Sequence, residues 1–229
     1  GQSLFSIFPT SEDEGALGDS LHLDNPTSNN NYIKITDPGS TTADVFTSKK
    51  GTFSFWVKEH SEEHASDLTY YSSGTDSSNR IWLRKQTSSS SLDGIINVTI
   101  NSGSYKSENI VIDKAGWYHH CVSIDTTRDN NYTKVRYWIN GIELGWASTA
   151  SLTNNQLLSF GTNQRINELF YTSGYGLDAT YADFKFIHGQ ALYPTNFGSL
   201  KYGVWVPKAY DKAKPDTNSA LTTDHLLAD

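Results

Sequence analysis

Apolar and polar residues alternate through much of this chain, which is the period of two that a β-strand imposes. In the run "GTFSFWVKEH" (51–60), Phe53, Phe55 and Val57 share one face and Trp56 lies on the other. Similar runs recur at short intervals, separated by clusters of Ser, Thr, Asn, Asp and Gly. Blocks of Ala, Glu, Lys and Leu that favour helices are scarce. The pattern predicts an all-β fold of many short strands joined by polar turns.

The run "GWYHHCVSID" (116–125) places two histidines beside the only cysteine, and such a group could be catalytic or structural. Read by twos, His120 shares a face with Val122, while His119 and Cys121 share the other. Both faces are largely apolar or aromatic, so we expect a strand that is covered on both sides. Two residues along a strand separate side-chain origins by roughly 7 Å, too far for a direct proton relay. Cys121 is therefore interpreted as a small packing residue.

The next run, 135–139, alternates in the same way and stops at Asn140-Gly141. Asn-Gly between two alternating runs is a strong signal for a two-residue hairpin, because both residues tolerate positive φ. The residues from 126 to 134 are expected to form a polar loop. In the later run 177–188, Ala182, Phe184 and Phe186 are expected to point together into the core.

Composition limits the classes of function. The chain has 229 residues, with 18 Lys and Arg against 25 Asp and Glu, a net charge of −7. No block is basic, which argues against nucleic acid as a partner. One cysteine excludes an internal disulfide framework, and no apolar run approaches the roughly 20 residues that insertion into a membrane requires. We expect one β-sandwich domain over 1–229, with a core from about 20 to 210, an N-terminal arm (1–19) and a C-terminal extension (211–229).

Four motifs occur in a characteristic order: "GTFSFWVK" (51–58), "GWYHHCVSIDTT" (116–127), "VRYWINGIEL" (135–144) and "GLDATYADFKFIHGQALYPTNFG" (176–198). In this order and spacing the chain resembles concanavalin A-like, laminin-G-like jelly-roll domains. The closing "GVWVPKAY" (203–210) resembles the version found in tail-fibre and other virion surface proteins of tailed phages, particularly marine and cyanobacterial ones. His120 and Cys121 stand where that family has aliphatic residues, which supports a packing role for both.

The resemblance implies a two-sheet antiparallel jelly-roll sandwich on the surface of a virion, as a tail fibre, capsid fibre or decoration protein. Its implied partners are other virion proteins, a host cell-surface glycan and further copies of the chain, since fibre proteins of this kind commonly form trimers. The family's Asp-Gly turn before its last long strand appears here as Leu177-Asp178-Ala179, so no role is carried over to that turn.

Three functions remain open, and the first is glycan recognition. Sugars are bound by aromatic rings that stack on them and by planar polar groups that satisfy hydroxyls. The loop "FYTSGYGLDATY" (170–181) supplies such groups, and Trp146 follows the predicted hairpin; a surface loop or a subunit contact would use the same residue types. The candidate carbohydrate-binding residues are Tyr171, Ser173, Tyr175, Asp178 and Trp146.

The second function is a laminarinase-like glycoside hydrolase, which the same fold class includes. Such an enzyme needs two carboxylates roughly 5 to 5.5 Å apart. Glu12 and Glu14, and Glu62-Glu63-His64, lie in polar segments without strand periodicity, and we expect no catalytic residues. The third function is purely architectural, as a capsid or tail decoration domain.

No cofactor is expected with certainty, but Ca²⁺ is a candidate because it prefers oxygen ligands from loops. Two polar loops offer such oxygens, "GTDSSNR" (74–80) and "DTTRDNN" (125–131). Neither has the spacing of an EF-hand, and Asp and Asn are also the residues that turns require. The candidate metal ligands are Asp76, Asn79, Asp125 and Asp129.

Overall fold

The computed structural model describes residues 4–7, 17–23, 31–35, 47–60, 67–87, 94–110, 112–113, 116–160, 163–169 and 176–213. Within this part of the chain the strands form two antiparallel seven-stranded sheets and two small two-stranded sheets. This architecture confirms the predicted all-β jelly-roll sandwich. Residues 1–3 and 8–16 of the predicted arm and 214–229 of the predicted extension lie outside the described residues.

The first sheet has the order β1-β16-β5-β10-β11-β12, with β2 paired to β16, and the second has the order β13-β9-β8-β7-β6-β15-β3. The strands of the first sheet are β1 (Leu4–Ile7), β2 (Ser20–Leu23), β5 (Lys50–Glu59), β10 (Tyr118–Asp125), β11 (Val135–Ile139), β12 (Ile142–Glu143) and β16 (Ala179–His188). Those of the second are β3 (Ile33–Ile35), β6 (Asp67–Asp76), β7 (Asn79–Thr87), β8 (Gly94–Ile100), β9 (Gly103–Ile110), β13 (Trp146–Ser148) and β15 (Gln164–Ile166). The other elements are β4 (Thr47–Ser48) with β14 (Leu158–Ser159), β17 (Gly198–Lys201) with β18 (Val204–Pro207), helix α1 (Asn131–Lys134) and the 3₁₀ turn η1 (Pro194–Asn196).

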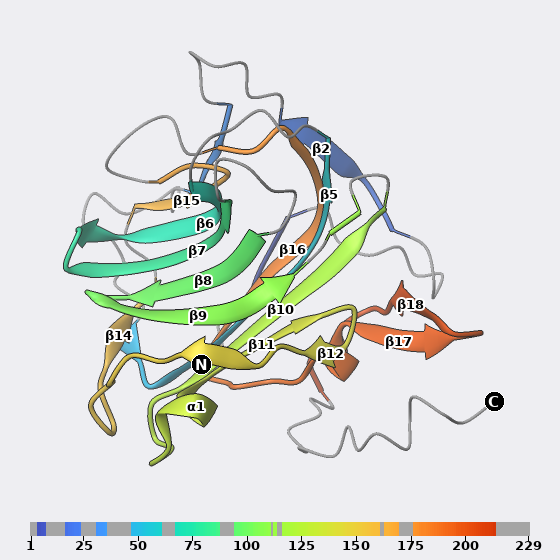
Figure 1. Cartoon of the computed structure of the whole chain (residues 1–229). Helices are drawn as coiled ribbons and strands as arrows, with labels where there is room; N and C mark the ends of the chain where they lie inside the picture. The colour runs from blue at the N-terminus through green and yellow to red at the C-terminus, as the bar shows by residue number, and fades with distance from the viewer. Residues whose placement is uncertain are drawn as a thin grey trace.

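The main core lies between the two large sheets, which form two layers in Figure 1. Phe53, Phe55 and Val57 of β5 are buried there beside Val122 and Ile124 of β10. This confirms the alternation that the sequence predicted for both strands. Burying a side chain of this size stabilises the fold by roughly 1.5–3 kcal/mol, so this face of β5 and β10 is a main source of stability.

The other face of β10 is covered by the C-terminal part of the chain. Cys121 packs there with Trp138 of β11 and with Leu192 and Phe197 in a second, smaller core. Burial raises the pKa of the Cys121 thiol, which leaves it protonated at neutral pH. A buried thiol without thiolate character is unreactive. The prediction that Cys121 is a packing residue is confirmed.

His119 lies on this same face and uses both ring nitrogens in hydrogen bonds. Its Nδ1 accepts the indole N–H of Trp205 in β18 at 3.0 Å. Because an indole nitrogen only donates, the neutral ring carries its proton on Nε2, which donates to Oγ of Ser54 at 2.9 Å. Burial lowers the pKa of His119 well below its usual value. His119 is therefore a neutral structural residue that fastens β18 to the first sheet.

Two hairpins end in two-residue turns with positive φ at both positions, as type I′ requires. Asn140 and Gly141 join β11 to β12 with φ of 49° and 77°, which confirms the predicted turn. Tyr202 and Gly203 join β17 to β18 with φ of 50° and 77°. Asn tolerates this conformation, whereas a residue such as Tyr adopts it at a cost of roughly 1–2 kcal/mol.

The predicted polar loop from 126 to 134 contains one element that the sequence analysis did not expect. Helix α1 occupies its last four residues and begins after Asn130, whose side chain accepts the backbone N–H of Tyr132 at 2.9 Å. This is the usual hydrogen bond of an Asn N-cap. Among the described residues, no helix has the length and apolarity that crossing a membrane requires.

The expectation for β16 was partly wrong. Phe184 and Phe186 do lie in the main core, but Tyr181 lies there with them in place of Ala182. A β-bulge between Ala182 and Lys185 shifts the register against β5, and Asp183 adopts a positive φ of 49° within it. An inserted residue moves all later side chains to the opposite face, so strict alternation along β16 fails at this point.

The main core also holds a buried ion pair. The ammonium of Lys85 in β7 contacts the carboxylate of Glu59 at the end of β5, and both residues are 3% exposed. The hydroxyl of Tyr70 donates to the same carboxylate at 2.7 Å. Nearby, Nδ1 of His120 lies 2.7 Å from the hydroxyl of Tyr137, and burial lowers the pKa of His120 to about 3. These polar groups are buried between the two sheets, so a substrate cannot reach them.

Candidate functional site

Polar side chains converge at the end of the sandwich where β2 lies, at the top of Figure 1. Nε2 of His22 lies 2.7 Å from Oδ1 of Asp178, and Nε2 of His60 lies 2.7 Å from the hydroxyl of Thr180. The two imidazole rings meet edge to face, with centroids 4.7 Å apart. We call His22, His60, Asp178 and Thr180 the imidazole rim.

Strand pairing brings these residues together. His22 is the direct cross-strand partner of Thr180, because β2 pairs with β16. His60 follows β5, on the other side of β16, and its backbone N–H donates to the carbonyl of Asp178 at 2.8 Å. The imidazole rim is also open to solvent, since the side chains of His22 and Asp178 are 53% and 22% exposed. Its polar groups are thus held in place and accessible.

Asn167 ties the imidazole rim to the second sheet. It has a left-handed backbone, with φ of 69°, and follows β15. Its Nδ2 donates to the carbonyls of Asn31 (3.0 Å) and Leu177 (2.9 Å). Its Oδ1 accepts the backbone N–H of Leu177 at 2.8 Å and the hydroxyl of Tyr181 at 3.1 Å. One side chain therefore holds the segments before β3 and before β16 side by side.

This tie places an aromatic side chain near the imidazole rim. Tyr32 follows Asn31 directly and is 39% exposed. The guanidinium of Arg165 lies 4.6 Å from the centroid of its ring, which is cation–π geometry. Arg165 in turn pairs with the carboxylate of Glu168. The imidazole rim thus offers imidazole, carboxylate and hydroxyl groups, and the Asn167 tie brings the segment that carries Tyr32 to the same end of the sandwich.

Such a set suits the recognition of hydroxyl-rich ligands. Imidazoles and hydroxyls both donate and accept hydrogen bonds, carboxylates accept them, and an aromatic ring packs on the apolar face of a sugar. The described residues contain no group of three or more His, Cys, Asp or Glu side chains with the geometry of a metal site. The arrangement therefore offers hydrogen-bond donors and acceptors together with an aromatic ring.

The predicted sugar-binding residues do not form one cluster in the described part of the chain. Tyr171, Ser173 and Tyr175 lie outside the described residues. Asp178 belongs to the imidazole rim. Trp146 lies at the other end of the sandwich, because its indole N–H donates to the carbonyl of Val135, directly after α1, at 2.7 Å. In Figure 1 α1 is at the bottom and β2 at the top, so Asp178 and Trp146 do not act together.

The predicted calcium ligands Asp76 and Asn79 lie in the turn between β6 and β7. Oδ1 of Asp76 accepts the backbone N–H groups of Ser78 (2.7 Å) and Asn79 (3.1 Å), and the side-chain amide of Asn79 donates to both its carboxylate oxygens. Hydrogen bonds from Asn79, Ser78 and Thr75 lower the pKa of Asp76. Asp76 and Asn79 therefore act as turn residues, and their hydrogen bonds stabilise the turn between β6 and β7.

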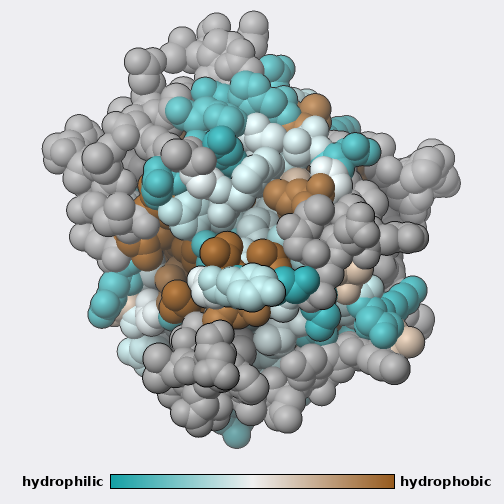
Figure 2. All heavy atoms as spheres, turned by 90° about the vertical axis from the view of Figure 1, so that its right-hand side faces the viewer, coloured by the Kyte–Doolittle hydropathy of each residue, from teal (hydrophilic) through white to brown (hydrophobic). Residues whose placement is uncertain are grey.

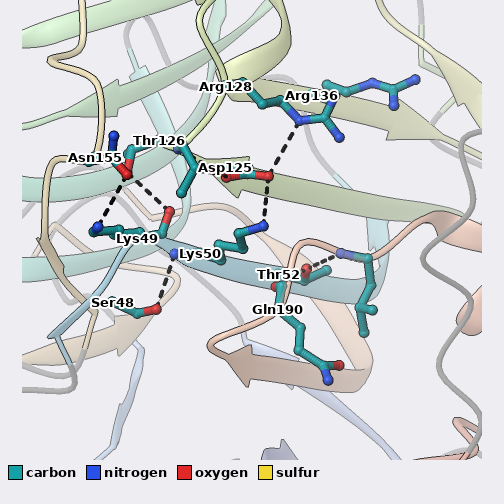
Figure 3. A network of polar contacts seen from close by, with 12 residues as sticks. Ser48, Lys49, Lys50, Thr52, Asp125, Thr126, Arg128, Arg136, Asn155 and Gln190 are labelled. Carbon is teal, nitrogen blue, oxygen red and sulfur yellow. Dashed lines mark hydrogen bonds and ion pairs between the residues drawn. The ribbon is translucent and has the colours of Figure 1, made fainter.

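The other predicted calcium ligands lie near α1. The carboxylate of Asp125 lies 3.2 Å from Nζ of Lys50 and 3.5 Å from Nε of Arg128, as Figure 3 shows. Burial acts to raise the pKa of Asp125, but hydrogen bonds from Thr127 and Lys50 outweigh it and the pKa falls below its usual range. Asp129 accepts the side-chain amide of Asn154 at 2.9 Å. The positive charges of Lys50 and Arg128 oppose the binding of a further cation at Asp125. The geometry around Asp125 therefore does not support a Ca²⁺ site.

The sequence analysis missed His22, His60, Tyr32 and Asn167. These residues are brought to the site by contacts between distant parts of the sequence. His22 and Asp178, for example, are 156 positions apart. No local spacing rule detects such a contact. Only the order of the strands in the first sheet reveals it.

Comparison with protein-family models gives no match, and comparison with curated protein sequences gives none. Among solved structures, the chain is similar to a heptameric SAP-like pentraxin from Limulus polyphemus, with 12% identity and a TM-score of 0.52 over 72% of this chain and 73% of the pentraxin. It is also similar to the CBM40 of a sialidase from Ruminococcus gnavus bound to α2,3-sialyllactose (12% identity, 83% and 95% coverage, TM-score 0.46). A third similarity is to domain 4 of AbnA, an extracellular arabinanase from Geobacillus stearothermophilus (16% identity, 78% and 85% coverage, TM-score 0.46). At these identities the likeness concerns the fold alone, and the pentraxin comparison supports the two-sheet jelly-roll sandwich seen in this chain.

Proposed function

We propose that this chain is a non-enzymatic glycan-binding module and that the imidazole rim, with Tyr32 beside it, is its binding site. The observation that carries the proposal is the convergence of two exposed imidazoles and a carboxylate at one end of the sandwich. Tyr32 follows Asn31, whose carbonyl Asn167 ties to the segment before Asp178. Sugar hydroxyls need donors and acceptors in fixed directions, and the pairing of β2, β16 and β5 supplies them.

The groups of this site support binding without hydrolysis. A retaining glycosidase needs a second carboxylate within roughly 5 to 5.5 Å of the first. At the imidazole rim the carboxylate of Asp178 pairs with an imidazole. Glu59, at the end of β5, is buried in an ion pair with Lys85 and is 3% exposed. We therefore expect the module to bind oligosaccharides and to release no reducing sugar from them.

A glycan array of the isolated chain tests the proposal. We expect the wild type to bind at least one glycan and the double variant H22A/H60A to lose that binding. Tyr32→Ala should weaken it, whereas Tyr132→Ala, at a 55% exposed tyrosine of α1 on the opposite end of the sandwich, should not. A wild type that binds no glycan, or an H22A/H60A variant that binds normally, would show that the imidazole rim is not a sugar site.

The biological setting that we propose is the surface of a phage virion, as a tail fibre, capsid fibre or decoration protein. This rests on the resemblance of "GVWVPKAY" (203–210) to virion surface domains. Cryo-electron microscopy of the particles that carry the chain tests this setting. Density for the sandwich on the outer surface, with β2 facing outward, would support recognition of a host glycan; a β2 end buried against the particle would favour the architectural alternative.

A further inference from the structure

A lysine stands beside the imidazole rim in the same row of side chains. Lys58 of β5 is the direct cross-strand partner of Thr180, on the side of β16 opposite to His22. Because directly opposed residues share a face of a sheet, His22, Thr180 and Lys58 form one row across β2, β16 and β5. Opposed residues have Cβ atoms roughly 4.5–5.5 Å apart, so Lys58 can reach a ligand that lies on the imidazole rim.

The ammonium of Lys58 differs from the other cations of this sheet. Within the part of the chain that the structure describes it forms no ion pair and no hydrogen bond, and the residue is half-buried. Every other Lys or Arg in the strands of the first sheet contacts a carboxylate. These pairs are Lys50 with Asp125, Arg136 with Glu143 and Lys185 with Asp183. Pairing is the rule in this sheet, and the charge of Lys58 is the exception.

Two carboxylates lie near Lys58, one along β5 and one at the imidazole rim, and both are bound elsewhere. Glu59, the next residue of β5, is buried in the main core against Lys85. Asp178 accepts a hydrogen bond from His22, which belongs to β2 on the far side of β16. A carboxylate accepts and an ammonium donates, so the β5 side of the imidazole rim has a charged donor without an acceptor.

We infer that the imidazole rim and Lys58 together bind an oligosaccharide that carries an anionic group, either a carboxylate or a sulfate. This inference rests on the proposed glycan-binding function and names the class of its ligand. The ammonium of Lys58 binds the anionic oxygens through charge-assisted hydrogen bonds, which are roughly twice as strong as neutral ones. Figure 2 keeps the β2 end of the sandwich at the top, as in Figure 1, and shows hydrophilic side chains gathered there.

A glycan array that holds matched pairs tests this inference. It carries sialylated glycans beside their desialylated parents, uronic-acid glycans beside their methyl esters, and sulfated glycans beside the unsulfated ones. We expect the charged member of at least one kind of pair to bind at least about tenfold more tightly, as a hydrogen bond to a charged group provides. The kind of pair that responds distinguishes a carboxylate from a sulfate. Added salt should reduce the preference, because it screens an exposed charge pair.

Variants of Lys58 then assign the preference to its charge, with affinities measured by isothermal titration calorimetry. Lys58→Gln should lose about tenfold in affinity for the charged glycan and should bind the uncharged parent as the wild type does. Lys58→Arg keeps the positive charge and should keep the preference. Lys106→Gln, at an exposed lysine of β9 in the second sheet, makes the same change of charge away from the imidazole rim and should alter neither affinity.

The outcomes separate this inference from the function on which it rests. Equal affinity for the charged and uncharged members of every pair would overturn the inference and leave the glycan-binding function standing. A preference that survives in Lys58→Gln would do the same. A wild type that binds no glycan on the array would overturn both.

Discussion

Gly141 lies directly against the ring of Trp205, and a Cβ at this glycine would stand 2.6 Å from Cζ3 of the indole. Gly141 also has a φ of 77°, which side chains rarely adopt. We expect Gly141→Ala to destabilise the protein by about 1–3 kcal/mol, because it strains the turn and displaces Trp205 from its place on the first sheet. Gly145→Ala is the matched control, since nothing lies within 4 Å of a Cβ there. Equal urea midpoints for both variants would contradict this account of the contact.

The buried His120 should make stability depend on pH. Its pKa is about 3 in the folded chain, against about 6.5 when unfolded, so the unfolded chain binds the extra proton between these values. Its contribution is therefore complete above pH 6.5 and is lost as the pH falls toward 3, at a rate of about 1.4 kcal/mol per pH unit. Urea unfolding at pH 7, 6 and 5 measures this slope. His120→Phe should have a shallower slope than the wild type, and an unchanged slope would contradict this account.

Cys121 should not react in the folded protein. The side chain is fully buried, and burial raises the pKa of the thiol. The thiol therefore stays protonated, and a reagent cannot reach it. A thiol reagent such as DTNB at pH 8 should label no cysteine in native conditions and one cysteine per chain in 6 M guanidinium chloride. Rapid labelling of the native protein, with the circular dichroism spectrum unchanged, would mean that the second core is open to solvent.

The ion pair of Glu59 and Lys85 should be costly to break from one side. Glu59→Gln leaves a buried ammonium without its counter-charge, and we expect a loss of about 3–5 kcal/mol of unfolding free energy. Glu143→Gln breaks the pair with Arg136 at a carboxylate that is 41% exposed, and should cost below about 1 kcal/mol. The double variant Glu59→Leu with Lys85→Met should recover most of the loss. If Glu59→Gln lowers the unfolding free energy as little as Glu143→Gln does, breaking the buried pair from one side is not costly.

Asn167 should control the geometry of the imidazole rim. Asn167→Ala removes four hydrogen bonds and places alanine at a φ of 69°, so we expect a loss of about 2–4 kcal/mol. Asn154→Ala, which removes one exposed hydrogen bond to Asp129, is the control and should cost little. Thermal unfolding checks both variants. Where Asn167→Ala remains folded, it should also bind the array glycan more weakly than Asn154→Ala does.

Much of the fold followed from local pattern. Alternation in β5 and β10 predicted which side chains face the core, and Asn140-Gly141 predicted its turn, because strand periodicity and positive φ are properties of adjacent residues. The same rule failed in β16, because no neighbouring residue predicts the bulge at Asp183. The interpretation of Cys121 as packing also followed from its place in a two-faced apolar strand.

By itself, then, the sequence determined an all-β sandwich, its main strands and the buried character of Cys121, since each depends on short-range periodicity. The tertiary structure alone decided that His22, His60 and Asp178 meet, that Asn167 joins two sheets and that Trp146 lies at the opposite end from Asp178. It also showed that the ring of Tyr202 is unpartnered within the described residues, as its 99% exposure requires. The physical reason is that these relations are set by which segments meet in the folded sheets, and the local pattern of residues does not determine which segments meet.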